Sequence, residues 1–257
     1  MKISIITACF NSHDYIQQCL TSVQSQNHQN IEHIIIDGGS TDGTLRIIEQ
    51  NRSRDSIVVS ERDDGIYHAL NKGISLATGD IIGFLHSDDL YNDQNVITDV
   101  CDEFVKSDPD SLFGDLIYVS RQNHNKVLRY WKSGEFRKGS FKWGWMPPHP
   151  TFFVKKEVYN KYGDFDTRLR IAADYEIMLR FLEKIKISTS YIPKTLVKMR
   201  IGGESNRNLK NIFLKSREDF RAWRINGLRC NFYTIFLKNI LKLEQFIHFG
   251  GNNYESE

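Results

Sequence analysis

Residues 31–36 (IEHIII) run directly into residues 37–42 (DGGSTD), and this stretch decides the fold. A short isoleucine-rich run that ends in glycines and small polar residues is typical of a buried parallel strand leading into the N-terminus of a helix. Three other apolar runs among the first ninety residues also end in polar or acidic groups: residues 3–9, 57–60 and 81–85. Helical stretches separate these runs, so the sequence predicts an α/β fold with a mostly parallel sheet flanked by helices.

Acidic groups follow these runs at the edge where such sheets bind ligands. Asp37, Asp64 and the pair Asp88 and Asp89 each come shortly after one of the runs. In open parallel sheets, ligands bind beyond the carboxyl ends of the strands. One crevice should therefore collect carboxylates from residues far apart in the sequence, which suits a metal-bound phosphate ligand.

Apolar periodicity and turn residues predict further elements along the chain. The expected helices cover about residues 13–26, 65–77, 90–106, 172–184, 207–226 and 231–248. The expected later strands cover about residues 111–119, 127–131, 151–154, 187–192 and 196–200, and the second of these forms a hairpin with the first.

Composition excludes several classes of protein. The 257 residues can hold one large α/β domain with an appendage, and a net charge of +2 gives no reason to expect a nucleic-acid partner. No uncharged apolar stretch reaches the roughly 18–20 residues that span a bilayer. No signal-peptide pattern follows Met1, so we expect a cytoplasmic location. No pattern predicts an oligomeric state.

The glycine-containing segment at residues 37–43 is a candidate ligand loop. Its glycines let the backbone approach a ligand closely, and the following helix N-terminus favours an anion. The alternative is a tight turn that caps the helix. The turn after the first strand, residues 7–11 (TACFN), contains no glycine, so the dinucleotide fingerprint is absent and a nicotinamide or flavin enzyme is disfavoured.

Asp88 and Asp89 are a candidate metal site. Adjacent carboxylates repel each other unless a cation or a hydrogen-bond donor compensates. Their hard oxygen ligands suit Mg²⁺ or Mn²⁺, which typically bridges carboxylates to substrate phosphates. The alternative is a solvated helix N-terminus, where aspartates stabilise the helix dipole.

Asp174 is a candidate general base. It lies in the first turn of a part-buried helix whose apolar positions are Ile177, Leu179, Phe181 and Leu182. A carboxylate at this place can simply cap the helix. The functional alternative is that Asp174 removes a proton from a substrate.

Four motifs, taken together and in this order, resemble the family 2 inverting glycosyltransferases of the GT-A fold. The motifs are residues 37–44 (DGGSTDGT), 71–74 (NKGI), 87–89 (SDD) and 173–180 (ADYEIMLR). The chain is most similar to the bacterial members that build surface polysaccharides. The resemblance covers residues 1–205 and implies a GT-A catalytic domain there, with a nucleotide-sugar-binding half over 1–109 and an acceptor-binding half over 110–205.

The resemblance implies a nucleotide-sugar donor, with UDP-sugars favoured, a divalent cation and a single displacement that inverts the anomeric centre. It also assigns roles to residues of this chain. Asp174 matches the catalytic base, and Asp88 and Asp89 match the metal motif, with Asp89 favoured as the direct ligand. The residues that match the nucleotide-sugar pocket are Thr7, Asn11, Asp37, Asp64 and Asp88. This chain has Ser-Asp-Asp at the position where the family has Asp-x-Asp. It therefore stays open which of the two carboxylates contacts the metal and which contacts the ribose.

Two loops are candidates for further substrate contacts. Residues 132–150 form a long loop rich in aromatic residues and proline, in which Trp145 can stack on a sugar and His149 can reach an acceptor or a phosphate. The alternative is an aromatic lid that only adds to the core. Residues 200–205 resemble a mobile loop that closes over the donor diphosphate, with Arg200 supplying positive charge.

The C-terminal segment, residues 206–257, is predicted to be a basic amphipathic helical extension. Basic residues far outnumber acidic ones in its helical part, and its apolar residues fall near one helix face. A basic amphipathic helix can lie on an anionic membrane, which suits a peripheral contact with the inner membrane and a lipid-linked acceptor. The alternative is a helix packed on the catalytic domain or on a second subunit.

The sequence therefore predicts a metal-dependent inverting glycosyltransferase that moves a sugar to a glycan or lipid-linked oligosaccharide in cell-surface polysaccharide biosynthesis. A sugar-1-phosphate nucleotidyltransferase is one competing class, but residues 7–12 lack the Gly-rich basic first turn that it needs. A non-catalytic nucleotide-sugar-binding module is another, and Asp174 would then have no role as a base.

Overall fold

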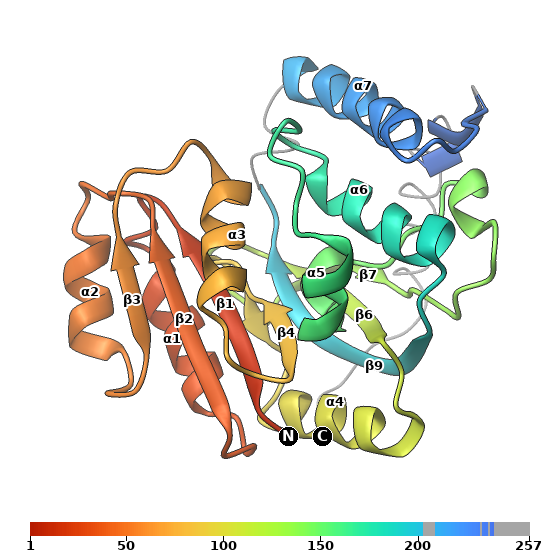
Figure 1. The fold of residues 1–257 in the computed structure, drawn as a ribbon. Helices are drawn as coiled ribbons and strands as arrows, with labels where there is room; N and C mark the ends of the chain where they lie inside the picture. Colours follow the sequence, from red (N-terminus) through yellow and green to blue (C-terminus); the bar gives the residue numbers. More distant parts are fainter. Residues whose placement is uncertain (203–208, 232, 236, 239–257) are drawn as a thin grey trace.

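The computed structural model describes residues 1–202, 209–231, 233–235 and 237–238 (Figure 1). The strands in this part of the chain are β1 Ile3–Cys9, β2 Ile31–Asp37, β3 Ile57–Ser60, β4 Ile81–Phe84, β5 Leu90–Tyr91, β6 Ser111–Val119, β7 Val127–Trp131, β8 Phe153–Lys155 and β9 Thr189–Arg200. The helices are α1 Ile16–Gln24, α2 Thr44–Asn51, α3 Ile66–Leu76, α4 Val96–Ser107, α5 Lys156–Tyr162, α6 Ala173–Leu179 and α7 Leu209–Ile225.

All these strands form one sheet, in the order β3-β2-β1-β4-β8-β6-β9-β5, with β7 paired to β6. β3, β2, β1 and β4 are parallel, as the apolar runs predicted. The register pairs Cys9 with Asp37 and Asp37 with Ser60, so the carboxyl ends of three strands lie level with one another. β8 is antiparallel to both β4 and β6 and continues the sheet into the second half of the chain.

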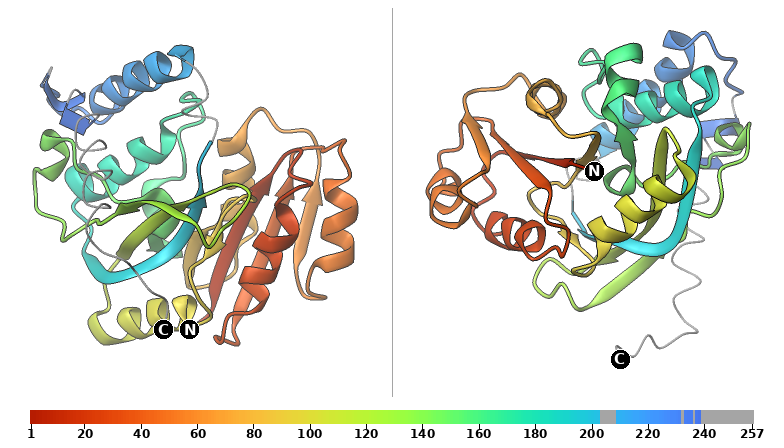
Figure 2. Two further views of the ribbon diagram at one scale, coloured as in Figure 1. Left: turned by 180° about the vertical axis from the view of Figure 1, so that it is seen from behind. Right: turned by 60° about the horizontal axis from the view of Figure 1, so that its bottom comes forward.

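Helices cover both faces of the sheet, because the buried strands are apolar on both sides. Ile6, Ile34 and Ile36 face α3 on one side, whereas Ile35 packs towards α1 and α2 on the other (Figure 2). In the second half, α4 covers one face, and α5 and α6 cover the other (Figure 1).

One glycine sets the distance between a helix and the sheet. Gly73 lies in α3 against β1, where a Cβ atom would come within 2.4 Å of Cγ2 of Ile6. A glycine at this place in the predicted NKGI motif therefore allows α3 to lie close to the strand. The close packing of α3 matters for the site, because the first turn of this helix carries Tyr67.

Two predicted elements differ from the structure. The helix expected over residues 90–106 begins only at Val96, because Leu90 and Tyr91 pair with β9 as the short strand β5. The two strands expected over residues 187–192 and 196–200 form one strand, β9, whose pairing with β6 shifts register near Asp115.

α7 packs against α6 in the described part of the extension (Figure 1). The indole N–H of Trp223 donates to the Tyr175 hydroxyl at 2.9 Å, and Asn226 donates to Glu176 at 3.0 Å. α7 thus packs on the catalytic domain, as the second alternative for the extension predicted, and membrane contact by its outer face stays a prediction. Most of the helix predicted over residues 231–248 lies outside the described residues. None of the described helices is long and apolar enough to cross a bilayer.

Candidate active site

The first loops of the candidate site connect the ends of β1 and β2. Asn11 follows β1 in a left-handed backbone conformation (φ 48°), which asparagine tolerates better than most residues. Its side-chain oxygen accepts a hydrogen bond from the backbone N–H of Thr41 at 2.9 Å, and its own N–H donates to the Ser40 hydroxyl at 2.8 Å. Asn11 thus joins the two loops at the carboxyl edge of the sheet and remains exposed there.

Asp37 is fully buried and has protein partners on both carboxylate oxygens. Its Oδ2 accepts bonds from the Ser40 N–H at 3.1 Å and from the Ser60 hydroxyl at 2.7 Å, and its Oδ1 accepts a bond from the Ser40 hydroxyl. These contacts fix the turn after β2. In this structure the Asp37 carboxylate binds protein groups and so stabilises the loop. Its contact with a nucleotide base remains a prediction.

Thr7 and Asp64 lie in contrasting positions. Thr7 is fully buried in β1, and its hydroxyl pairs with Nε2 of His33 at 3.0 Å on the next strand. Asp64 is exposed in the turn before α3, next to Gly65 at φ 124°. Asp64 is thus open to a ligand and Thr7 is not, while donor binding by either residue remains a prediction.

Asp88 and Asp89 lie in the loop that follows β4. Asp88 is half-buried, whereas Asp89 is 1% exposed. Oδ1 of Asp89 accepts a bond from the Arg200 backbone N–H at 3.3 Å, and its Oδ2 has no hydrogen-bond partner. Burial and the nearby Asp88 raise the pKa of Asp89 well above its ordinary value.

Arg200 supports this loop from the end of β9. It is 2% exposed, and its guanidinium donates to the backbone carbonyl of Asp88 and to the side chain of Gln18. The same guanidinium lies 5.0 Å from the centre of the Tyr15 ring. Arg200 therefore contacts protein groups in this structure. Its predicted contact with a donor diphosphate is not tested, and most of the loop predicted to close, residues 203–205, lies outside the described residues.

The two carboxylates of this loop fit a divalent cation. An unpartnered carboxylate oxygen that is buried beside a second carboxylate is unfavourable by itself, and a cation would compensate both. In the part of the chain that the structure describes, no group of three or more histidine, cysteine or acidic side chains could hold a metal ion. That is compatible with Mg²⁺ or Mn²⁺, which usually takes one or two carboxylates together with substrate phosphates and waters.

Asp174 lies at the start of α6, and the hydroxyl of Tyr67 from α3 reaches it. That hydroxyl is 3.2 Å from Oδ1 of Asp174 and 2.8 Å from the carbonyl of Ile171. Burial alone would raise the pKa of Asp174, but its electrostatic interactions with His149, Lys215 and Lys238 lower it below the ordinary value. The carboxyl group is therefore ionised at neutral pH and can accept a proton.

Two neighbouring imidazoles interact with these carboxylates. The rings of His86 and His149 are 5.8 Å apart, and His86 interacts electrostatically with both Asp88 and Asp174. Burial lowers the pKa of His149 to about 4 and lowers that of His86. Nδ1 of His86 and Nε2 of His149 have no hydrogen-bond partner. Two neighbouring neutral rings with unpartnered nitrogen atoms thus interact with Asp174, and His86 interacts with Asp88 as well.

The aromatic segment after β7 is mainly a packed lid. Trp145 is half-buried, packs near Phe113 and Phe141, and donates its indole N–H to the Ser133 carbonyl at 2.7 Å. His149 is 7% exposed and stacks on Phe84 with ring centres 5.3 Å apart. The packed-lid alternative thus describes Trp145 well, and contact of either residue with an acceptor remains a prediction.

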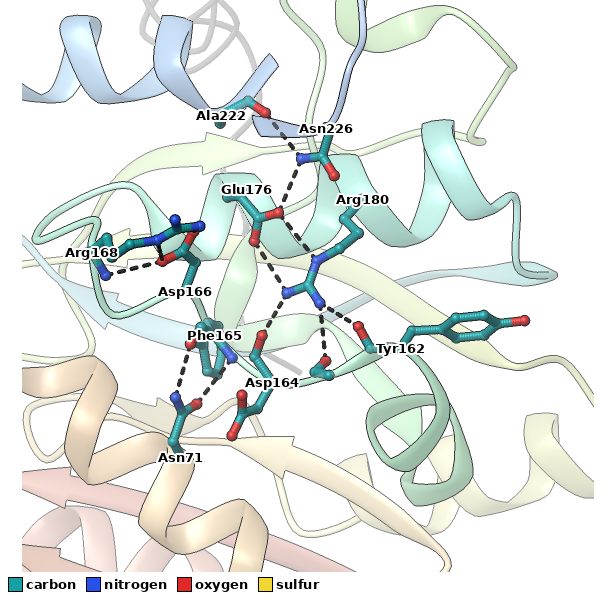
Figure 3. Close-up of polar contacts among 11 residues, drawn as sticks. Asn71, Tyr162, Asp164, Phe165, Asp166, Arg168, Glu176, Arg180, Ala222 and Asn226 are labelled. Atoms are coloured by element: carbon teal, nitrogen blue, oxygen red, sulfur yellow. Dashed lines mark hydrogen bonds and ion pairs between the residues drawn. The ribbon is translucent and has the colours of Figure 1, made fainter. Parts of the chain in front are cut away.

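Sequence reasoning missed the residues that hold the loop around Asp174. Asn71, within a predicted motif, pairs with both the N–H and the carbonyl of Phe165, at 3.0 and 2.8 Å (Figure 3). Tyr67, in the same helix, was not singled out, and neither was Glu218 in α7. Each contact joins residues about 50 to 110 positions apart, so no local pattern could have revealed it.

A parallel half-sheet with polar loops at its carboxyl edge, continued by an antiparallel half that carries a carboxylate, defines an α/β enzyme of the GT-A type. The sequence model of Glycosyl transferase family 2 matches residues 4–163. This match covers more than half of the chain, and the chain therefore belongs to that family.

Known relatives agree with this assignment. The chain is 28% identical over 217 residues to the PGL/p-HBAD biosynthesis glycosyltransferase of Mycobacterium bovis (strain BCG / Pasteur 1173P2), covering 82% of each chain. It is 32% identical over 186 residues to an uncharacterized glycosyltransferase of Mycobacterium tuberculosis (strain CDC 1551 / Oshkosh), covering 69% of this chain and 68% of that one.

Solved structures share the fold. S. aureus TarS 1–349 in complex with UDP-GlcNAc superposes with a TM-score of 0.66 at 18% identity, over 97% of this chain and 73% of that one. This chain spans 44% of the longer TarS chain. The mannosyltransferase PcManGT of Pyrobaculum calidifontis, in complex with GDP-Man and Mn²⁺, superposes with a TM-score of 0.65 at 17% identity, over 97% of this chain and 70% of that one. The GT-A fold predicted from the sequence is thereby confirmed.

Proposed function

We propose that this protein is an inverting glycosyltransferase that moves a sugar from a nucleotide-sugar, with UDP-sugars first, to a glycan or lipid-linked glycan acceptor in cell-surface polysaccharide biosynthesis. One observation carries the proposal: Asp174 and Asp88, 86 residues apart in the sequence, both interact electrostatically with the half-buried His86, whose ring lies 5.8 Å from that of His149. A base candidate and a metal candidate that converge on one small region suit single displacement at an anomeric carbon.

Asp174 acts as the general base in this proposal. An acceptor hydroxyl is a weak nucleophile, and its proton passes to the Asp174 carboxylate as its oxygen bonds to the anomeric carbon. The bond from that carbon to the phosphate oxygen breaks at the same time, and the nucleoside diphosphate leaves with the electron pair. A base on the face opposite the leaving group gives inversion. The low pKa of Asp174 keeps it in the ionised form that this step requires.

Asp88 and Asp89 would hold Mn²⁺ or Mg²⁺ beside the donor diphosphate. When bound, such a cation stabilises the negative charge that develops on the leaving diphosphate. Arg200 orients this loop, because it donates hydrogen bonds to the Asp88 carbonyl and the Asp89 carboxylate. In this proposal its guanidinium also supplies positive charge near the diphosphate. Asn11 and Asp64 are exposed at the carboxyl edge of the sheet and are therefore the candidates for contacts with the nucleoside. Asp37 would act indirectly, by stabilising the loop after β2.

The imidazoles suit the sugar. Neutral His86 and His149 each offer one unused ring nitrogen, which can donate to or accept from a sugar hydroxyl. Both rings interact electrostatically with Asp174, which in this proposal receives the proton of the acceptor hydroxyl. The half-buried face of Trp145 in the lid would contribute an apolar surface to the acceptor side.

The exposed face of α7 suits an acceptor that is carried by a membrane. Phe213, Arg217, Phe220 and Arg224 follow the spacing of one helix face, and all four are exposed, with Phe213 at 75% and Phe220 at 43%. Arginine and phenylalanine on an exposed helix face can bind an anionic lipid surface. This face supports a peripheral contact with the cytoplasmic side of the inner membrane.

Thermal stabilisation and product release test the proposal. A ligand that binds only the native state raises its melting temperature, so we expect one nucleoside diphosphate, with Mn²⁺ present, to raise Tm more than either component alone. The matching nucleotide-sugar should then release nucleoside diphosphate, slowly with water and faster with an acceptor. Release of pyrophosphate from a nucleoside triphosphate and a sugar-1-phosphate would instead indicate nucleotidyl transfer. Binding without any turnover across a panel of acceptors would indicate a binding module.

A further inference from the structure

Glu218 of α7 binds the backbone of the loop that leads into Asp174. Its carboxylate accepts hydrogen bonds from the N–H groups of Arg170 at 3.0 Å, Ile171 at 2.8 Å and Ala172 at 3.0 Å. Glu218 is 5% exposed. One buried carboxylate thus receives three consecutive backbone donors from a segment 46 to 48 positions earlier in the chain.

These donors lie directly before a helix and include its N-cap residue. α6 begins at Ala173, and its N-cap residue, Ala172, has no side chain that could accept a hydrogen bond. The carboxylate of Glu218 binds the amides up to and including that of Ala172, and its negative charge is favourable at a helix N-terminus. Hydrogen bonds to a charged acceptor are the stronger kind. The amides of residues 170–172 are therefore bound by a side chain of α7.

Tyr67 holds the same loop from the other side. Its hydroxyl lies 2.8 Å from the Ile171 carbonyl and 3.2 Å from Asp174, while Glu218 holds the Ile171 N–H. Both polar groups of Ile171 are thus fixed, by α7 and by α3 respectively. Asp174 follows three residues later, so a shift of this peptide would move the Asp174 carboxylate.

We propose that Glu218 is a positioning residue for Asp174: it fixes the loop of residues 170–172 and thereby the place of the base. The inference rests on the proposed function, because it needs Asp174 to act on a substrate. Glu218 itself contacts no substrate, since its carboxylate is buried and occupied by the backbone. A misplacement of about 1 Å at a catalytic group can cost on the order of 100-fold in rate.

The attachment of α7 to α6 does not depend on Glu218 alone. Trp223 donates to the Tyr175 hydroxyl. Asn226, which follows α7, donates at 3.0 Å to Glu176, the residue after Tyr175 in α6 (Figure 3). Asn226 is as buried as Glu218, at 4% exposed, yet it does not reach residues 170–172. Asn226→Ala is therefore a matched control that removes a buried contact between α7 and α6 without freeing the loop.

The experiment compares wild type, Glu218→Gln and Asn226→Ala in the full chain. Glutamine keeps the size of the side chain but has one acceptor oxygen and no charge, so it cannot serve all three amides. Hydrogen–deuterium exchange of a peptide that spans residues 168–174 directly measures how well Glu218 protects the amides of residues 170–172. Steady-state release of nucleoside diphosphate from the UDP-sugar that wild type accepts measures turnover, and Tm is recorded for each variant.

We expect Glu218→Gln to exchange the amides of residues 170–172 at least tenfold faster and to lose about 10- to 100-fold in kcat. The donor KM should stay within about twofold, because the carboxyl ends of β1, β2 and β4 are unchanged. Asn226→Ala should lower Tm with normal kcat and normal exchange in this peptide. An unchanged kcat in Glu218→Gln, or an equal loss in both variants, would overturn the inference. Absence of turnover in wild type would instead refute the proposed function, and the exchange data would still decide whether Glu218 holds the loop.

Discussion

Asp174→Asn separates the role of Asp174 as a base from its role in the fold. Asparagine has nearly the same shape, and its side-chain oxygen can accept the bond from Tyr67 that reaches Oδ1 at 3.2 Å. The variant should therefore fold, with a change in the free energy of unfolding below about 1 kcal/mol. It cannot accept a proton, and a general base contributes about 10²- to 10⁴-fold. The expected loss in kcat corresponds to about 3–5 kcal/mol in the barrier.

The assay is nucleoside diphosphate release at saturating donor, together with calorimetric donor binding in the presence of Mn²⁺. Donor Kd should stay within about threefold of wild type, because the substitution removes no proposed donor contact. A tenfold change in Kd would require about 1.4 kcal/mol of binding free energy. Asp164→Asn is the control, since Asp164 lies exposed in the loop after α5 and should retain full turnover. Turnover of Asp174→Asn within tenfold of wild type would refute the assignment of the base. Loss of donor binding in that variant would show that Asp174 binds the donor instead.

Three further predictions concern the metal, the sheet and the membrane face. Asp89→Ala should abolish the Mn²⁺-dependent rise in Tm on adding nucleoside diphosphate, and a rise equal to that of wild type would exclude Asp89 as a ligand. Burial alone would raise the pKa of Glu32, but hydrogen bonds from its neighbours lower it to about 2 from 4.5, so its ionised form stabilises the fold by about 3 kcal/mol at pH 7. That contribution is complete above about pH 4.5 and is lost as the pH falls towards 2. In urea unfolding, Glu32→Gln should therefore have a lower free energy of unfolding than wild type at pH 7 and nearly the same one near pH 2. An equal loss of unfolding free energy at both pH values would contradict the assignment. Phe213→Ser with Phe220→Ser should reduce flotation with vesicles that contain about 30% anionic lipid, at unchanged Tm, and undiminished flotation would exclude this face as the contact.

The parallel half of the sheet was readable from the sequence because its strands are buried on both faces. A strand that is covered on both sides is apolar throughout, so the run from Ile3 to Cys9 coincides with β1. Leu90 and Tyr91 were assigned to a helix because they lie a few residues before one. Their pairing with Lys198 and Val197 joins positions more than 100 residues apart, and local periodicity carries no information about such a pair.

Site residues could be proposed from the sequence only where the residue type itself suggests the chemistry. Asp88, Asp89 and Asp174 are acidic groups at strand or helix ends, and their type suggests what they do. Asp37 has the same residue type, but its environment differs, since Ser40 and Ser60 occupy its oxygens. Burial and partners decide whether a carboxylate meets a ligand or the protein, and both depend on the tertiary fold.

Donor binding and turnover should be separable in this protein because two different sets of contacts fix their residues. The register of β1, β2 and β4 places the loops of Asn11 and Asp88, so we expect the side chains at this edge of the sheet to determine donor binding. Asp174 depends instead on a loop that has no strand partner and is held by Tyr67 from α3 and Glu218 from α7. Substitutions in the two helices should therefore lower kcat at nearly constant donor affinity, whereas substitutions at the sheet edge should change affinity first. A helix that follows the family-matched region, residues 4–163, would then control the chemical step without touching either substrate.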